Sequence, residues 1–454
     1  MVRVGCGARI GLLAAAVFFM VVQMRLFAVQ SHYADRIASA IENENECIRL
    51  KRNLIDKYSS QQGRVIALEE ETERLENKFA QLTMLVQDYQ NRDRSRKQSQ
   101  NIVVEGEIVA AVVIMACNRP DYLERTLKSV LKYQIPVAGK FPLFVSQDGS
   151  MEAVKVVAKG FPEVTYLQHV GGEPLRKQNP QENDAYYKIA SHYKWALTEL
   201  FNKRSFSRVI ILEDDMEIAP DFFDYFEATS WLLEEDKSVV AVSSWNDNGQ
   251  RQFVYDSKAI YRSDFFPGLG WMLTSQFWEE LRPKWPAAYW DDWLRLNSTR
   301  KGRHFIRPEV CRTYNFGEHG SSMGQFFKQY LEPIKLNDVA VNWKSKDLGF
   351  LQEERFNREF AALIARALPL PNSQANVVKM AESVGEDVRI EYSSQRQFEG
   401  LARLFGVFEE WKDGVPRTAY KGVVVFRWMG KKKIYFLRPD SLRLLGFKGE
   451  EISR

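Results

Sequence analysis

Hydrophobic residues in the middle of the chain follow two alternating patterns. Runs rich in apolar, often β-branched residues predict four strands, at residues 107–115, 141–146, 164–169 and 208–212. Between these runs, residues 121–132 and 186–200 predict helices, the first of which places its apolar side chains on one face. Strands that alternate with helices predict an α/β fold in which helices cover both faces of a parallel sheet.

The pattern is less regular toward the C-terminus. Residues 239–312 are rich in Trp, Asp and Pro, and they predict an irregular segment. Further along we expect a helix at 356–367, strands at 389–392 and 422–427, and a hairpin at 428–436 around Gly430.

The N-terminal pattern predicts a membrane anchor. An apolar run at residues 10–29, purest up to Val22, follows the positive charges of Arg3 and Arg9. Positive charge ahead of an apolar run keeps the N-terminus in the cytosol. We therefore expect a cytosolic tail at 1–9, a transmembrane signal-anchor and a lumenal remainder. A cleaved signal peptide stays an alternative, because the uninterrupted apolar core is short.

Residues 30–104 predict a polar helical stem, since they are rich in Glu, Gln, Lys and Arg and contain no proline. Within residues 65–90 the apolar positions recur at steps of three and four, as in the seam of a coiled coil. Such a seam would pair two chains into a homodimer. A single solvated helix is the alternative, because about three to four heptads are marginal evidence for a coiled coil.

Composition narrows the classes of function. The 454 residues include 63 basic and 59 acidic side chains, for a net charge of +4. This balance is too even to suggest a nucleic-acid binder, in which a concentrated basic face supplies most of the affinity. Hydrophobic residues make up 45%, enough for a large core. The four cysteines show no C-x-x-C pair, so neither a disulfide scaffold nor a zinc ribbon is expected. Cys117 is expected to pack as a buried thiol.

The sharpest chemical feature is a row of three acids, Glu213, Asp214 and Asp215, directly after the apolar residues 210–212. The carboxyl ends of parallel strands line the ligand crevice of an open sheet. Adjacent carboxylates repel one another unless a cation shares them, and oxygen ligands suit Mg²⁺ or Mn²⁺. The sequence therefore predicts a metal site that serves a phosphorylated donor. An acidic turn that caps a helix starting near Pro220 is the alternative.

Two other strand ends carry polar groups. Arg119 follows the first strand, and its planar fork is suited to a diphosphate. Asp148 follows the second strand and could accept a hydrogen bond from a base or a ribose, or could simply cap a turn. No glycine-rich phosphate loop follows any predicted strand, so the nucleotide would be held in another way.

A second acidic cluster lies at Trp290, Asp291, Asp292 and Trp293, where an aromatic ring could stack on a sugar while an acid takes a proton. Core tryptophans beside solvated acids are the alternative. His192 stands alone in a helix and by itself suggests packing more than ligand binding. The small-residue loop 320–325 could meet a phosphate, although that signal is weak.

Motifs from about residue 105 to the C-terminus resemble the N-acetylglucosaminyltransferase I family: ACNRP, VSQDG, HYKWAL, ILEDDMEIAPDFF, FPGLGWM, YWDDW, RPE and GQFF. The resemblance implies a GT-A glycosyltransferase fold, with a Rossmann-like nucleotide-binding half and an acceptor half at 105–335 and a smaller C-terminal domain at 336–454. It also implies an inverting Golgi enzyme that initiates hybrid and complex N-glycans, and a single-pass type II protein of the Golgi membrane.

The resemblance assigns the acidic row and its neighbour to the donor. Asp215 corresponds to the one direct protein ligand of Mn²⁺. Glu213 and Asp214 correspond to groups that hold the GlcNAc hydroxyls and the ribose. Arg119 corresponds to a ligand of the diphosphate.

The remaining roles implied by the resemblance come from other parts of the chain. Asp148 and His192 would recognise the uracil, Trp290 would contact the donor sugar, and Ser322 would reach a phosphate oxygen. Asp291 corresponds to the catalytic base.

The implied reaction is a single displacement in which Asp291 takes the proton of the 2-hydroxyl of an α-linked mannose as that oxygen attacks GlcNAc of UDP-GlcNAc. The acceptor would be an oligomannose N-glycan, and the product a β1,2 linkage. Two alternatives are kept: transfer to O-linked mannose of glycoproteins, and a non-catalytic sugar-binding or scaffold protein. One departure is clear, because animal members of the family carry a cysteine where this chain has Gly149, so no bridge from Cys117 to that position can form.

Overall fold

The computed structural model describes residues 18–30, 107–171, 182–320, 324, 326–372 and 376–447. Two compact units divide the chain at residues 1–104 and 105–454, and each is considered by itself. In the first unit, residues 18–30 form a helix with exposed apolar side chains. None of the helices within the described residues has both the length and the apolar character that a bilayer crossing requires. Residues 31–104, with the predicted coiled coil, lie outside the described part.

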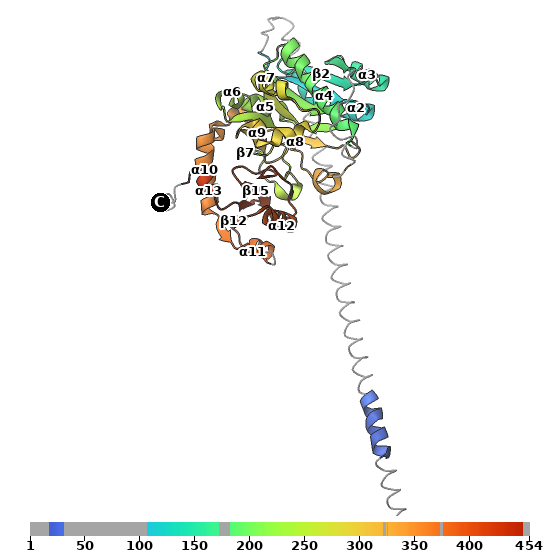
Figure 1. Ribbon diagram of the computed structural model, residues 1–454, viewed down its shortest axis with the longest axis vertical. Coiled ribbons are helices and arrows are strands. Elements are labelled where there is room, and N and C mark those ends of the chain that lie inside the picture. The colour runs from blue at the N-terminus through green and yellow to red at the C-terminus, as the bar shows by residue number, and fades with distance from the viewer. Residues whose placement is uncertain are drawn as a thin grey trace, which may run out of the picture. The chain divides into compact units, whose positions relative to one another are not determined.

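A mixed sheet of eight strands forms the centre of the second unit, in the order β3-β2-β1-β4-β8-β6-β9-β7. Figure 1 labels two of these strands, β2 and β7. The strands are β1 (Ala111–Ala116), β2 (Leu143–Asp148), β3 (Val164–His169), β4 (Arg208–Glu213), β6 (Val239–Ser243), β7 (Ile260–Ser263), β8 (Trp271–Thr274) and β9 (His304–Pro308). Strands β3, β2, β1 and β4 run parallel, which matches the first half of a Rossmann-like sheet. The predicted α/β class is therefore confirmed.

Two expectations about this sheet are wrong. Strand β8 pairs antiparallel with both β4 and β6, and β7 pairs antiparallel with β9, so the sheet is mixed rather than parallel. The segment 239–312, expected to be irregular, supplies four of the eight strands. These strands are four or five residues long, too short for a reliable alternation pattern, and their pairing is decided by the tertiary structure.

Helices cover the parallel half as predicted. Helix α2 (Pro120–Gln134) begins with a proline, which suits a first helical turn, and buries a stripe that includes Leu123, Leu127 and Val130. Helix α4 (Asp184–Thr198) begins at Asn183, whose side chain accepts a hydrogen bond from the N–H of Ala185. Helix α3 (Glu152–Lys159), between β2 and β3, was not predicted.

The C-terminal region forms a second sheet, in the order β11-β12-β16-β15. Its strands are β11 (Leu368–Leu370), β12 (Val388–Glu391), β15 (Val423–Trp428) and β16 (Lys432–Leu437). Strands β15 and β16 pair antiparallel around Gly430, whose φ of +97° favours glycine, so the predicted hairpin is confirmed. Helices α10 (Glu353–Arg366) and α12 (Gln395–Phe405) lie in the same region.

The remaining elements are short connections. The helices are α5 (Phe222–Thr229), α6 (Leu232–Glu235), α7 (Ser275–Leu281), α8 (Trp290–Arg295), α9 (Asn297–Arg300), α11 (Val377–Ser383) and α13 (Ser441–Leu444), and the strands are β5 (Met216–Ile218), β10 (Thr313–Asn315), β13 (Trp411–Lys412) and β14 (Val415–Pro416). Single-turn 3-10 segments lie at 135–137, 251–253, 282–284, 343–345 and 349–351, and π-type turns at 199–203 and 327–331.

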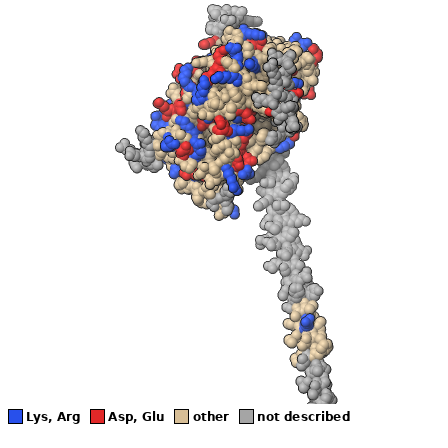
Figure 2. Space-filling view, in the orientation of Figure 1, with Lys and Arg blue, Asp and Glu red and all other residues tan. Residues whose placement is uncertain are grey.

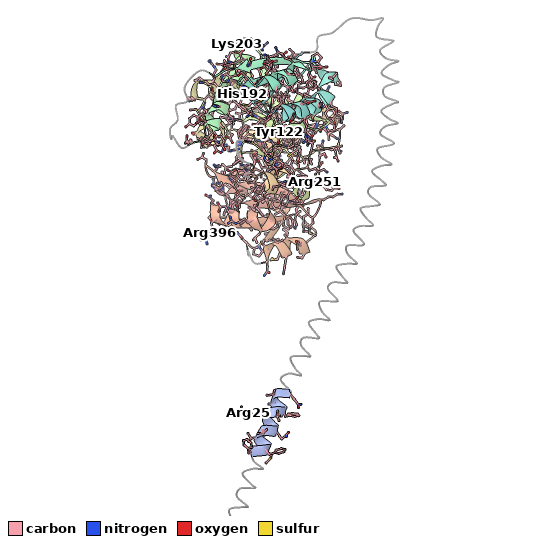
Figure 3. The ribbon with its side chains drawn as sticks, turned by 90° about the vertical axis from the view of Figure 1, so that its right-hand side faces the viewer. Arg25, Tyr122, His192, Lys203, Arg251 and Arg396 are labelled. Carbon is pink, nitrogen blue, oxygen red and sulfur yellow. The ribbon has the colours of Figure 1, made fainter. Side chains whose placement is uncertain are left out.

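The hydrophobic core crosses the predicted boundary between residues 335 and 336. One cluster joins Val112, Leu127 and Ile210 of the parallel sheet and its helix to Phe360 and Tyr435 of the C-terminal region. A separate cluster, which includes Val377, Phe398 and Phe436, fills the space between the second sheet and its helices. Figure 3 shows that His192 and Arg396 lie toward opposite ends of this unit.

A buried ion cluster fastens the C-terminal region to the sheet. His304 on β9 lies 2.6 Å from Asp264 through Nδ1 and 3.5 Å from Glu353 of α10 through Nε2. Lys421 donates to both acids, from its backbone N–H to Asp264 and from Nζ to Glu353. Burial lowers the pKa of His304, but the hydrogen bonds that it donates to Asp264 and Glu353 outweigh this effect and raise that pKa overall. The pKa values of both acids are lowered.

The raised pKa of His304 predicts a pH-dependent contribution to stability. The imidazolium form stabilises the fold fully below the unfolded pKa of about 6.5, and this contribution is lost as the pH rises through the higher folded pKa. We expect His304→Gln to lower the free energy of unfolding by about 2 kcal/mol at pH 5.5 and by clearly less at pH 9. Denaturation of both proteins at the two pH values measures this difference, and an equal loss at both values would contradict it.

Candidate active site

The carboxyl ends of β1, β2 and β4 open into a cavity of about 880 Å³. Helix α4 forms a further wall, and residues 315–320 close another side. Six predicted site residues line this cavity: Arg119, Asp148, His192, Glu213, Asp214 and Asp215. The sequence prediction that these strand ends meet at one crevice is therefore correct.

The acidic row forms the turn that leaves β4, and Asp214 and Asp215 are buried, with exposures of 3% and 5%. Burial raises the pKa of Glu213 to about 7 and that of Asp214 to about 6, and it also raises the pKa of Asp215. Asp215 contributes to both of the other shifts because like charges repel. The row is therefore a site of concentrated and poorly solvated negative charge.

Arg119 is the cation that faces this row. Its Nη2 donates to Asp214 and lies 2.9 Å from Oδ2 of Asp215, while Nη1 donates to the carbonyl of His319 at 2.9 Å. Burial lowers the pKa of Arg119, but the charges of Asp215 and Asp214 outweigh it and raise that pKa overall. One guanidinium thus faces three carboxyl groups, and a divalent cation would balance the remaining charge.

Asp215 is held in place by the segment of β10 and the loop after it. Asn315 donates from Nδ2 to Oδ1 of Asp215 at 2.8 Å, and the N–H of Phe316 donates to the Asp215 carbonyl at 2.9 Å. Gly317 leaves room for the carboxylate, because a Cβ there would lie 2.1 Å from Oδ2 of Asp215. From α2, the buried Thr126 donates to the carbonyl of Asp214 and accepts from the N–H of Met216.

A histidine-rich corner lies at the ends of β2 and β3. His169 holds Oδ1 of Asp148 at 2.7 Å through Nδ1, and His192 pairs with Oγ of Ser146 at 2.7 Å through Nε2. Burial lowers the pKa of His192 to about 4, so its ring is neutral near pH 7. A neutral imidazole and a carboxylate can together read the donors and acceptors of a base edge.

Trp290 lies one layer behind the cavity wall. It is 6% exposed and stacks on Tyr193 at 4.4 Å and on Trp271 at 5.7 Å. Tyr193 lines the cavity and donates to Glu213 at 2.9 Å. Burial raises the pKa of Tyr193 well above its usual value, and the charges of Glu213, Asp215 and Asp291 add to the rise.

Asp291 and Asp292 begin α8 beside Trp290, and their side chains are 44% and 40% exposed. Arg295, one turn later, pairs with Asp291 at 3.0 Å and with Asp292 at 2.6 Å. Asp292 also pairs with Lys412 at 3.2 Å. The residue before the helix, Tyr289, has a φ of +51°, a left-handed conformation that costs energy for a residue with a Cβ.

Other predictions for this region have mixed outcomes. Cys117 is exposed and lines the cavity rather than packing inside, because β1 ends at Ala116. It is a free thiol, and Gly149 has a φ of +83° that favours glycine. Ser322 lies outside the described residues.

Four supporting residues of the cavity were missed by the sequence analysis: Thr126, Tyr193, Asn315 and Gly317. Each acts on the acidic row from a distant part of the chain. Only Tyr193 had a local signal, because it lies beside His192 on the predicted helix.

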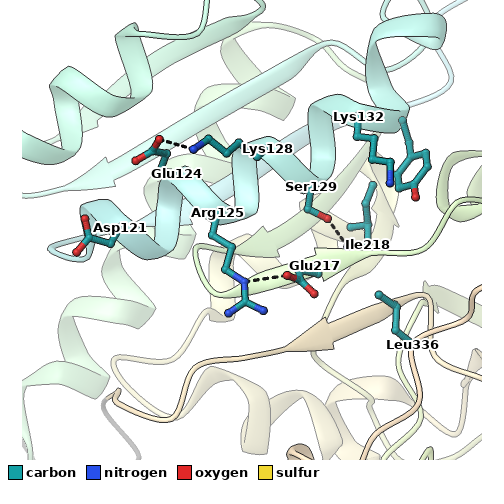
Figure 4. Close-up of a pocket in the computed structure, with 10 residues that line it drawn as sticks. Asp121, Glu124, Arg125, Lys128, Ser129, Lys132, Glu217, Ile218 and Leu336 are labelled. Atoms are coloured by element: carbon teal, nitrogen blue, oxygen red, sulfur yellow. Dashed lines mark hydrogen bonds and ion pairs between the residues drawn. The ribbon is translucent and has the colours of Figure 1, made fainter. Parts of the chain in front are cut away.

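A second groove, of about 600 Å³, lies between α2 and β5 (Figure 4). Four of its charged side chains are paired with one another, since Arg125 binds Glu217 at 2.8 Å and Lys128 binds Glu124 at 2.6 Å. On the face drawn in Figure 2, basic and acidic side chains are interspersed over the described surface of the second unit. Neither feature presents the concentrated charge that a polyanion requires.

Comparison with known proteins identifies the family. The family model described as the GNT-I family matches residues 13–448. A relative from Arabidopsis thaliana, alpha-1,3-mannosyl-glycoprotein 2-beta-N-acetylglucosaminyltransferase, is 58% identical over 449 residues, which cover 99% of this chain and 100% of the relative. The chain belongs to the GNT-I family. The family expected from the motifs is thus confirmed.

Two solved structures show a distant similarity to this GNT-I family member. The mannosyltransferase PcManGT from Pyrobaculum calidifontis, in complex with GDP-Man and Mn²⁺, has a TM-score of 0.30 at 17% identity over 48% of this chain. S. aureus TarS 1–349 has a TM-score of 0.33 at 13% identity over 46% of this chain. Each match covers 61% of the solved chain, less than two thirds of its length.

The cavity of this GNT-I family member fits a divalent cation in two respects. The acidic row offers only oxygen ligands and carries more negative charge than Arg119 neutralises. Gly317 leaves space beside Oδ2 of Asp215 that the Cβ of any other residue would fill. Within the described residues, no group of three or more His, Cys, Asp or Glu side chains could hold an ion. A cation at Asp215 would therefore take further ligands from phosphates and water.

The close approach of Gly317 to Asp215 generates a test. Gly317→Ala places a methyl group 2.1 Å from Oδ2 of Asp215, closer than van der Waals contact allows, so the carboxylate must move. We expect transferase activity to fall by about 100-fold, the order of loss for a displaced active-site group. The matched control is Gly139→Ala, because a Cβ at Gly139 meets nothing within 4 Å. Full activity of Gly317→Ala would show that the position of Asp215 is unimportant.

Proposed function

We propose that this chain transfers GlcNAc from UDP-GlcNAc to the 2-hydroxyl of the α1,3-arm mannose of Man5GlcNAc2 N-glycans, with inversion and formation of a β1,2 linkage. The observation that carries the proposal is the 58% identity, over 99% of the chain, to a relative named for a 2-beta-N-acetylglucosaminyltransferase of mannosyl-glycoproteins. The cavity supports it, because Arg119 and the acidic row provide both kinds of group that a nucleotide sugar needs. This reaction would initiate hybrid and complex N-glycans.

The proposal includes a GT-A fold and dependence on Mn²⁺. Asp215 would be the protein ligand of the ion, held by Asn315 and left uncrowded by Gly317. When bound, the ion supplies positive charge that neutralises the diphosphate as it departs. The excess of carboxylates over cations at the cavity is the physical reason for expecting it.

The donor would be bound by groups on three strand ends. Arg119 can reorient its fork from Asp214 to the diphosphate, where a guanidinium binds two oxygens at once. Asp148, held by His169, and the neutral His192 would read the uracil. Glu213 and Asp214 would hold sugar and ribose hydroxyls.

Trp290 and Ser322 complete the proposed donor site. Trp290 stacks on Tyr193, which donates a hydrogen bond to Glu213, so the indole would contribute to the donor site by holding Tyr193 in place. Ser322 is proposed as a phosphate ligand from its position in the family motif.

Asp291 would act as the base that takes the acceptor proton. Of the two acids that begin α8, Asp292 is paired with both Arg295 and Lys412, whereas Asp291 is paired with Arg295. Asp291 is thus the less neutralised acid and is exposed enough to meet an alcohol. Removal of the proton as the oxygen attacks gives a single displacement, which inverts the anomeric centre.

The proposed location is the Golgi membrane, with the catalytic unit in the lumen. Residues 18–30 form a helix whose apolar side chains are exposed, including Phe19 at 63% and Phe27 at 75%. Such side chains favour a lipid environment over water. A signal-anchor at 10–29, a stem at 30–104 and pairing through a coiled coil at 65–90 complete this proposal.

Transfer assays distinguish the candidate acceptors. With UDP-GlcNAc, the chain should modify oligomannose N-glycan far faster than O-mannosyl peptide, and transfer should stop after EDTA treatment and return with Mn²⁺. Preference for O-mannosyl peptide would favour the alternative acceptor. Activity that persists after complete removal of divalent ions would contradict the proposed dependence on Mn²⁺. Absence of transfer to either acceptor would favour a non-catalytic sugar-binding protein.

Replacement of Asp291 tests the base. Asp291→Asn preserves the size of the side chain and removes the proton acceptor, so kcat should fall by about 10²- to 10⁴-fold. Binding of UDP-GlcNAc, measured by calorimetry, should be unchanged because Asp291 is not among the residues that line the donor cavity. The comparison variant, Asp292→Asn on the same helical turn, keeps the base itself, so its kcat should fall by no more than about five-fold, the factor of an exposed ion pair. Normal turnover in Asp291→Asn would exclude it as the base.

A further inference from the structure

The two acids of α8 are bridged by one guanidinium. Arg295 donates from the same nitrogen, Nη1, to Oδ2 of Asp291 at 3.0 Å and to Oδ1 of Asp292 at 2.6 Å. The side chain of Arg295 is 11% exposed, whereas those of the two acids are 44% and 40% exposed. A buried cation with two partially exposed partners fixes the direction in which each carboxylate points.

Arg295 is itself fixed by its surroundings. Its guanidinium packs over the ring of Phe265 at 4.8 Å, and Arg417 approaches the same ring at 5.0 Å. The charges of Asp291, Asp292, Asp247 and Glu410 together outweigh the cost of burying the guanidinium. Because the guanidinium is largely buried, packs over Phe265 and donates to both acids, Arg295 has little freedom to follow a moving carboxylate.

The second contact of Asp292 comes from the C-terminal region. Lys412, at the end of β13, lies 3.2 Å from Oδ2 of Asp292 and 3.8 Å from Glu410. The short β13–β14 hairpin that carries Lys412 pairs Trp411 with Pro416. A continuous path of contacts therefore runs from Asp291 through Arg295 and Asp292 to Lys412.

We propose that Arg295 and Lys412 are positioning residues for the transfer reaction, through which the C-terminal hairpin holds Asp291 at the angle that proton removal requires. This inference rests on the proposed role of Asp291 as the base. Arg295 occupies Oδ2 of Asp291, which directs Oδ1 toward the acceptor hydroxyl. Asp292 keeps Arg295 from withdrawing, and Lys412 keeps Asp292 charged and in place.

Such positioning acts on turnover and leaves donor binding alone. A carboxylate that points away from the near-attack geometry lowers the rate of proton transfer without changing the contacts of the nucleotide. The expected signature is a lower kcat with an unchanged affinity for UDP-GlcNAc. A general loss of folding would instead lower both.

The first experiment compares Arg295→Ala with Arg295→Lys in the full chain. Arg295→Ala should lower kcat by about 100-fold, close to the loss of a general base itself. Arg295→Lys keeps the charge but lacks the planar fork, so its kcat should be about ten-fold higher than that of Arg295→Ala and still below that of the wild type. Thermal denaturation and UDP-GlcNAc binding of each variant report on folding and on the donor cavity.

The second experiment uses Lys412, whose partially exposed side chain can be replaced without unfolding the core. Lys412→Met should lower kcat by about two- to five-fold, the factor that corresponds to an exposed ion pair. In Asp292→Asn the link is already weakened, so adding Lys412→Met should have little further effect. The matched control is Lys155→Met, which breaks the 3.0 Å pair with Glu152 on α3 and should leave kcat unchanged.

The outcomes separate this inference from the proposed function. If wild type transfers GlcNAc and Asp291→Asn does not, the base is supported, and Arg295→Ala and Lys412→Met then test positioning alone. Unchanged kcat in folded Arg295→Ala, or additive losses in Lys412→Met with Asp292→Asn, would overturn the inference. Equal losses of kcat and of affinity for UDP-GlcNAc would also overturn the inference. Failure of the wild-type protein to transfer GlcNAc would instead overturn the proposed function.

Discussion

The central constraint on this protein is the electrostatic cost of placing three carboxyl groups at the buried end of one strand. Glu213, Asp214 and Asp215 repel one another, and water is largely excluded from two of them. A turn of this kind does not hold its shape unaided. Arg119 supplies charge, and Asn315 supplies a hydrogen bond from a strand that lies one hundred residues further along the chain. The repulsion among these carboxylates therefore destabilises the fold locally, and the same carboxylates form a strongly anionic site.

Much of the parallel half of the sheet was predictable, because its signals are local. Strand β3 has the predicted bounds, and β4 differs from its prediction by one residue, Glu213. The other half was not predictable in the same way. Strands β6 to β9 are short, and β8 enters between β4 and β6 against their direction. Nothing in four residues of sequence specifies such an insertion, since the choice of partner is made by tertiary contacts.

The residues of the candidate site also fall into two groups, those with a local sequence signal and those that depend on tertiary contacts. Residues that immediately follow a strand, such as Arg119, Asp148 and Asp215, were found from position alone, and the structure brings them to one cavity. Residues that orient them were missed, because Asn315 and Gly317 act through tertiary contacts that leave no pattern. The roles of Trp290 and Asp291 were predicted only from the family motifs. These neighbouring residues differ greatly in exposure, so their spacing in the sequence does not indicate that they serve one site.

The shared hydrophobic core has a consequence for how the protein is made. Phe360 and Tyr435 help to complete a cluster that also contains Val112 and Ile210, and these two residues lie between 150 (360 − 210) and 323 (435 − 112) positions earlier in the chain. The parallel strands β1 and β4 therefore remain partly unpacked until the end of synthesis supplies their last neighbours. During that interval the apolar faces are exposed to chaperones and to self-association. Damage to the C-terminal region is thus expected to impair folding during synthesis as well as the stability of the finished protein.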